Sequence, residues 1–195
     1  WNKMAHRLGI KTEFLKTDWQ RGAIPEKIYE RLKKDPEKQI KAVCVVHNET
    51  STGSTSRINE VREAINAANH DALLMVDTIS GLASMEYKHD EWGIDVTVSG
   101  SQKGLMLPPG ISFNAISEKA IKISKKSGMR RSYWDWEEQI EANRNGSFPY
   151  TPATNLLYGL KEAIKMLHEE GLEKVFERHV RHAKATRLAV QAWGL

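Results

Sequence analysis

The sequence contains a single cysteine among its 195 residues, so no disulfide can form within the chain. Cys44 lies in the apolar run 42–46, a setting typical of a small core residue. Low cysteine usage fits a reducing compartment, and we expect the cytoplasm. Long apolar runs are also missing, since none approaches the roughly 20 residues of a membrane-spanning helix. We therefore expect no membrane partner.

A strong excess of one charge is also lacking, because 29 Lys and Arg oppose 25 Asp and Glu for a net charge of +4. This excess is too small to predict binding to nucleic acid. The basic stretch 119–131 is followed by Tyr133, Trp134 and Trp136, a combination that can bind single strands. We favour a solvated helix followed by a buried aromatic loop, because modest charge runs usually mark exposed faces. We expect no nucleic-acid partner and no metal site.

The middle of the chain alternates between apolar runs and a helical repeat. Residues 42–47, 72–76 and 94–98 are short, apolar and rich in β-branched side chains, as in strands buried on both faces. Between the first two, apolar residues recur at helical spacing over 58–68. This βαβ pattern predicts an α/β fold with three layers, in which a mostly parallel sheet carries helices on both faces.

Weaker patterns predict the flanking elements. Upstream, we expect the end of a helix at 3–9, a strand at 12–15 and a helix at 26–34 that follows Pro25. Downstream, the predicted elements are a strand at 111–116, a short helix at 118–125, a helix that opens at 151–154 and ends at Gly171, and a last helix at 172–193.

Functional side chains follow three strands of the predicted sheet, at the edge where ligands of open α/β sheets bind. Thr50 lies after the first strand, Asp77 ends the second and Lys103 follows the third. A carboxylate, an amine and hydroxyls at one edge suit a cofactor with a ring nitrogen, an aldehyde and a phosphate. Lys103 would react with the aldehyde of pyridoxal phosphate, and Asp77 would keep the ring nitrogen protonated. Taken alone, each residue also has an ordinary interpretation, as a surface lysine, a cap or a turn.

Three segments resemble the class V aminotransferases of the fold-type I pyridoxal-phosphate superfamily. They are HNETSTG at 47–53, LLMVDTISG at 73–81 and VTVSGSQKGLMLPPG at 96–110. The similarity is greatest to the serine–glyoxylate and alanine–glyoxylate branch. This resemblance implies a transamination in which an amino acid, serine or alanine, leaves as a keto acid and glyoxylate accepts the amine. It also allows a peroxisomal location in a eukaryote.

The resemblance implies a role for each matching residue. Lys103 would hold the cofactor covalently, Asp77 would pair with the pyridine nitrogen, and Gln102 would contact the phosphate or the ring. Thr50 matches a hydroxyl residue beside the ring oxygen. Thr151 matches a threonine that reaches the cofactor phosphate of the neighbouring subunit, so the resemblance implies a homodimer with shared active sites.

The family pattern is incomplete in this chain. We expect residues 1–195 to form part of the large cofactor-binding domain, without the N-terminal phosphate-binding loop and the C-terminal small domain. The arginine that binds the substrate carboxylate in the family has no match here. One alternative is therefore a truncated, non-catalytic homologue that acts as a dimerisation domain. Another is a cysteine desulfurase, although Cys44 lies in a predicted strand and not in a mobile loop.

Overall fold

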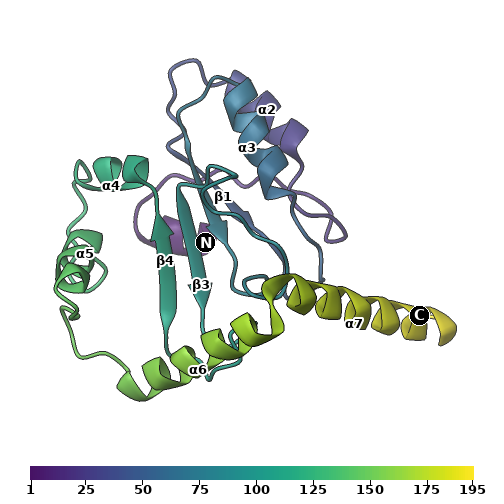
Figure 1. Ribbon diagram of the computed structural model, residues 1–195. Coiled ribbons are helices and arrows are strands. Elements are labelled where there is room, and N and C mark those ends of the chain that lie inside the picture. The colour runs from purple at the N-terminus through teal and green to yellow at the C-terminus, as the bar shows by residue number, and fades with distance from the viewer.

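A four-stranded sheet forms the centre of the computed structural model, which describes residues 1–195 (Figure 1). The strands are β1 (Ala42–Val46), β2 (Leu73–Asp77), β3 (Val96–Gly100) and β4 (Ser112–Ile116), in that order across the sheet. The first three are parallel, and β4 runs antiparallel to β3. The predicted α/β fold with a mostly parallel sheet is confirmed.

Seven helices surround the sheet (Figure 1). They are α1 (Asn2–Arg7), α2 (Pro25–Lys33), α3 (Ile58–Ala67), α4 (Glu118–Ser124), α5 (Trp136–Arg144), α6 (Thr154–Glu170) and α7 (Leu172–Ala192). Figure 1 shows α2 and α3 together at one side, α4 and α5 beyond β4, and α6 with α7 running past the lower ends of the strands. None of the helices combines the length and the apolar character needed to cross a membrane.

The main core lies between the sheet and helices α2 and α3. In the strands, Val45 pairs with Val76, and both side chains are buried toward these helices. The helices bury Ile28, Leu32, Val61 and Ile65 on the same core. Each such side chain stabilises the fold by about 1.5–3 kcal/mol when fully buried. The core therefore fixes the strands whose carboxyl ends carry the predicted functional residues.

A second, smaller cluster joins the loop after β3 to the last two helices. It consists of Leu105 from the loop, Leu167 from α6 and Val175 from α7, and all three are buried. Gly171 separates the two helices with a φ of 85°, a left-handed conformation that favours glycine. This corner between α6 and α7 is thereby placed against the loop that contains Lys103.

The predicted strand at 12–15 is wrong, because these residues are exposed and form no ladder. Their side chains make other contacts, since Thr12 bonds to Asn2 and Glu13 pairs with Arg31 Nε at 2.7 Å. A strand without a neighbouring strand is not stable by itself. Burial of the first strand on both faces is also wrong, because Val45 is buried on one face and its neighbour Cys44 is exposed on the other.

The predicted buried aromatic loop is exposed in the structure. Tyr133 and Trp134 expose 59% and 82% of their surface. Instead of entering the core, Tyr133 contacts Trp134 and Tyr150, with ring centroids 6.2 and 5.0 Å apart. The core beside α4 is too small to cover them, since Ala120 is the one residue that α4 buries.

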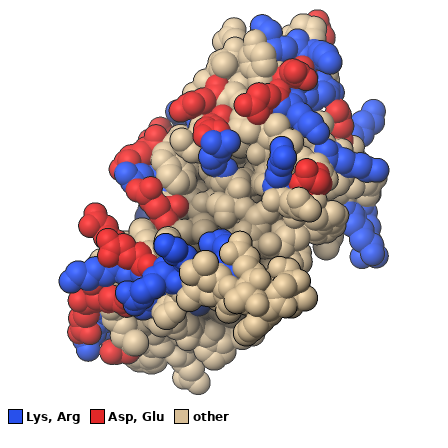
Figure 2. All heavy atoms as spheres, turned by 90° about the vertical axis from the view of Figure 1, so that its right-hand side faces the viewer, with Lys and Arg blue, Asp and Glu red and all other residues tan.

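The basic stretch 119–131 forms α4 and the turn after it, as the predicted solvated helix required. Several of its cations pair with acidic neighbours: exposed Lys125 with Glu137 at 3.2 Å, and half-buried Arg131 with Asp135 at 3.1 Å. Figure 2 shows the same mixing on another face of the molecule, where Lys and Arg lie among Asp and Glu. Exposed pairs of this kind stabilise a protein by about 0–1 kcal/mol each.

Candidate active site

The carboxyl ends of β1, β2 and β3 meet at one edge of the sheet. In the register, Val46 lies beside Asp77 and Asp77 lies beside Val98. The ladder continues one residue further, where His47 N donates to Asp77 O at 2.8 Å and Thr78 N donates to Val98 O at 2.8 Å. The three loops that follow therefore begin side by side, as the sequence predicted.

Asp77 shapes the turn after β2 and leaves one oxygen uncommitted. Its Oδ1 accepts a hydrogen bond from Ile79 N at 3.0 Å, a local contact that reverses the chain. The turn places Ser80 against the loop after β1, where its hydroxyl bonds to the hydroxyl of Thr50. Asp77 is half-buried, and its Oδ2 makes no hydrogen bond or ion pair within the chain. That oxygen is available to a positively charged group at this edge.

Lys103 lies on a tight loop that is held from both sides. Ser101 Oγ donates to Pro108 O at 2.7 Å, and Met106 N donates to Lys103 O at 2.9 Å. Gly104 approaches the turn after β2 so closely that a Cβ would lie 2.1 Å from Leu82 O. The Lys103 side chain is exposed, and its amine makes no hydrogen bond or ion pair. A fixed backbone thus presents a free amine.

A cavity of about 240 Å³ separates Lys103 from the corner between α6 and α7. Its lining comes from the loops and from the helices: Ser80, Ser84, Lys103, Gly104, Met106, Leu167, Val175, Arg178 and His179. Arg178 donates to both oxygens of Glu170 at 2.7 and 2.9 Å, and this pair raises the pKa of the arginine. His179 Nδ1 donates to Val175 O at 2.8 Å. Sequence reasoning missed these polar residues because no motif marks them.

The remaining predicted residues lie at the margin of this group. Gln102 is exposed, and its Oε1 folds back over Gly100, where a Cβ would lie only 2.7 Å away. Thr151 is exposed on the segment between α5 and α6 and forms no hydrogen bond with the other predicted residues. Within one chain, the structure therefore brings together Thr50, Asp77 and Lys103, whereas Thr151 makes no hydrogen bond with any of them.

The groups at this edge fit pyridoxal phosphate by their chemistry. A free amine can bond to the aldehyde, an uncommitted carboxylate oxygen can accept from the ring nitrogen, and hydroxyls can donate to the ring oxygen. Lys103, Asp77 and the pair of Thr50 and Ser80 supply these groups. No group of three or more His, Cys, Asp or Glu side chains is close enough to hold a metal.

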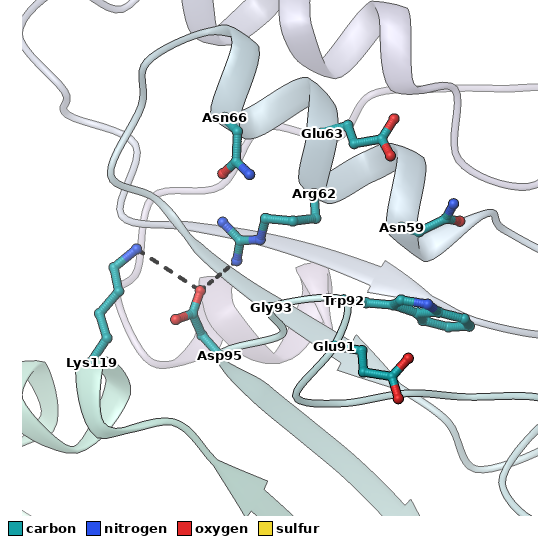
Figure 3. A pocket seen from close by; sticks show the side chains of 9 residues that line it. All are labelled: Asn59, Arg62, Glu63, Asn66, Glu91, Trp92, Gly93, Asp95 and Lys119. Carbon is teal, nitrogen blue, oxygen red and sulfur yellow. Dashed lines mark hydrogen bonds and ion pairs between the residues drawn. The ribbon is translucent and has the colours of Figure 1, made fainter.

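A larger cavity, of about 640 Å³, lies at the opposite end of β3 (Figure 3). Figure 3 shows Arg62 and Lys119 pointing toward Asp95, at 2.6 and 3.9 Å. Asp95 also accepts from Leu74 N at 2.9 Å and from Ser117 Oγ at 3.0 Å. Because Asp95 connects Arg62 of α3, the N-terminal ends of β2 and β3 and the start of α4, we interpret this carboxylate as structural.

The buried side chain of His47 follows β1 and lies beside the end of β2. Sequence reasoning did not identify it as a site residue, although it belongs to the HNETSTG motif at 47–53. His47 is 4% exposed, and its Nδ1 is buried without a hydrogen-bond partner. Its ring lies against Tyr87 and Trp92, with centroids 5.3 and 6.5 Å away. Burial lowers the pKa of His47 to about 4, so the ring is neutral near pH 7.

The low pKa of His47 predicts a loss of stability in mild acid. Between pH 6.5 and about 4 the unfolded chain binds a proton at this residue and the folded chain does not. The free energy of unfolding should therefore decrease as the pH falls through this range, by about 3 kcal/mol in total from this residue. Urea unfolding of the cofactor-free protein at several pH values measures it. The His47→Asn variant should show a shallower slope, and an unchanged slope would contradict this assignment.

The sequence and the fold of this chain are similar to those of known aminotransferases. Residues 1–193 match the model of the class V aminotransferase family. The serine–glyoxylate aminotransferase of Methylorubrum extorquens is 52% identical over 200 residues, and the L-aspartate–glyoxylate aminotransferase of Paracoccus denitrificans is 41% identical over 195. The solved ureidoglycine–glyoxylate aminotransferase of Bacillus subtilis has a TM-score of 0.85 and 34% identity. Each comparison covers 100% of this chain and 49–50% of the other, so the chain spans about half the length of these relatives.

Proposed function

We propose a function for this chain on the basis that it belongs to the class V aminotransferase family. The protein would be a pyridoxal-phosphate-dependent aminotransferase that moves an amine from an amino acid to glyoxylate. The family and the fold class predicted from the sequence motifs are both confirmed. The observation that carries the proposal is the free Lys103 amine at the same sheet edge as the uncommitted Oδ2 of Asp77.

Bound pyridoxal phosphate would supply an electron-accepting ring that stabilises negative charge at the substrate α-carbon. Asp77 Oδ2 would accept a hydrogen bond from the ring nitrogen, and its negative charge would keep that nitrogen protonated. The paired hydroxyls of Thr50 and Ser80 leave one O–H unused, and this O–H would donate to the ring oxygen. Lys103 Nζ would hold the aldehyde carbon and, once the substrate amine has replaced it there, would take the proton from the substrate α-carbon.

The names of the relatives support glyoxylate as the amine acceptor. The three relatives compared above are named for glyoxylate together with three different donors, namely serine, aspartate and ureidoglycine. The relative named for serine has the highest identity of the three, 52%. We therefore propose serine as the donor, with alanine as the next candidate, and glycine as the product formed from glyoxylate.

The chain would form most of the large cofactor-binding domain. Its span of about half of its relatives supports further segments, which would supply a phosphate-binding loop and an arginine for the substrate carboxylate. Thr151 is exposed and does not line the Lys103 cavity, which fits a contact with the cofactor of a second subunit in a homodimer. We propose the cytoplasm as the location. Cys44 lies in β1 and does not line the Lys103 cavity, so no observation favours a desulfurase.

Amine transfer in the complete protein tests the proposal directly. The protein, loaded with pyridoxal phosphate, should form glycine from glyoxylate at a rate that depends on added serine, as measured by chromatography of the amino acids. Alanine and aspartate serve as competing donors. A protein that binds the cofactor without forming glycine from any donor would instead support the non-catalytic dimerisation domain.

A further inference from the structure

We propose that the contact between His47 and Gly81 positions Asp77 and Ser80 for the cofactor, which makes His47 a positioning residue of the active site. This inference rests on the proposed function, since it concerns the same sheet edge. His47 does not need to touch the cofactor in this role. It acts through the turn at 77–81, which carries both the carboxylate and one of the two paired hydroxyls.

The backbone ties His47 directly to the residue that it would position. His47 N donates to Asp77 O at 2.8 Å, and His47 O accepts from Ser56 N at 2.8 Å. After Asp77, the chain turns through hydrogen bonds from Gly81 N and Leu82 N to Thr78 O, at 3.0 and 2.9 Å. The imidazole therefore lies inside the bend that Asp77 begins and Gly81 closes.

The turn approaches the imidazole edge so closely that only glycine fits at position 81. A Cβ on Gly81 would lie 2.7 Å from His47 Nδ1 and 3.4 Å from Met85 Sδ. Nδ1 is buried and has no hydrogen-bond partner, and it faces the side of Gly81 on which a side chain would begin. In the tautomer that has its hydrogen on Nε2, Nδ1 allows a closer approach than a C–H edge would. Histidine suits this place better than a phenyl ring of similar size.

The imidazole is itself held by a cluster that reaches the third strand. Tyr87 and Trp92 lie against it and against each other, with their own centroids 5.6 Å apart at 82°. Tyr87 Oη bonds to Thr97 Oγ1 at 2.6 Å, and Thr97 is buried in β3. The loop that contains Lys103 follows β3 directly. The aromatic cluster therefore lies in contact both with the turn that carries Asp77 and with the strand that leads to Lys103. A displaced ring would therefore change the distance between the carboxylate and the amine.

Cofactor affinity in the complete protein separates positioning from stability. We compare His47→Asn with His70→Asn, since His70 is also buried (7% exposed) and bonded to Asp35 at 3.2 Å, but precedes β2 at its other end. Both variants should unfold at a lower temperature without cofactor. Only His47→Asn should bind pyridoxal phosphate about tenfold to 100-fold more weakly and show lower kcat, because small misplacements of reacting groups have effects of this size. Native affinity in His47→Asn, or equal weakening in His70→Asn, would overturn the proposal.

A double-mutant cycle without cofactor tests the contact itself. Gly81→Ala should lower the unfolding temperature strongly in the native protein, because the new methyl group meets Nδ1. In a His47→Ala background the same change should have little effect, because the methyl group then has room. Equal effects in both backgrounds would overturn the contact. A native protein that does not bind pyridoxal phosphate would refute the proposed function, while this cycle would still decide the contact.

Discussion

Replacing Lys103 with alanine should reduce amine transfer by about ten thousandfold or more, because the residue has two successive roles. The variant loses the amine that holds the cofactor and the group that moves the proton at the substrate α-carbon. Folding should be unaffected, since the Lys103 side chain is exposed and makes no ion pair. Glycine formation from serine and glyoxylate measures the loss, and thermal unfolding without cofactor measures the stability.

The covalent role of Lys103 has its own readout and controls. The protein is reduced with borohydride in the presence of pyridoxal phosphate, and its peptides are mapped by mass spectrometry. The native protein should show one pyridoxyl adduct, at Lys103, and the Lys103→Ala variant should show none. Lys103→Arg keeps the positive charge without a reactive amine and should be as inactive as the alanine variant. Lys122→Ala, at an exposed lysine of α4, should keep native turnover and the adduct. Turnover near the native rate in Lys103→Ala would exclude the proposed role.

The two predicted residues whose position at the sheet edge could be foreseen follow strands with strong patterns. Asp77 and Lys103 could be placed because each lies within a few residues of a buried apolar run, and parallel strands bring their carboxyl ends to one edge. The edge follows from the order of strands and helices along the chain. The family motifs then indicated which of several polar residues there to choose.

The residues that the sequence did not reveal depend on contacts between distant segments. Arg178 and His179 line the Lys103 cavity only because Leu167 and Val175 pack on Leu105, and no local pattern announces this contact. Ser80 gained its place from the turn that Asp77 shapes. The errors have a similar origin, since the exposure of Cys44 depends on what packs on its face of β1 and not on its own apolar neighbours.

Replacing Asp77 with asparagine should lower kcat by about 100-fold to 1000-fold while weakening cofactor binding by less than about tenfold. Asparagine keeps an oxygen that can accept from Ile79 N, so the turn and its hydroxyl pair should persist. It removes the negative charge, so the ring nitrogen would lose its proton and the ring would accept electrons less well.

The separation of these two effects distinguishes Asp77 from an ordinary turn residue. If Asp77 only shaped the turn, Asp77→Asn would be nearly silent, while Asp77→Ala would reduce both cofactor affinity and stability by removing the acceptor of Ile79 N. If the charge matters, both variants should lose turnover to a similar extent, and only the alanine variant should also lose stability. Measuring kcat, cofactor affinity and the unfolding temperature for both variants therefore tests the charge and the turn independently. Turnover within twofold of native in Asp77→Asn would reduce Asp77 to a structural role.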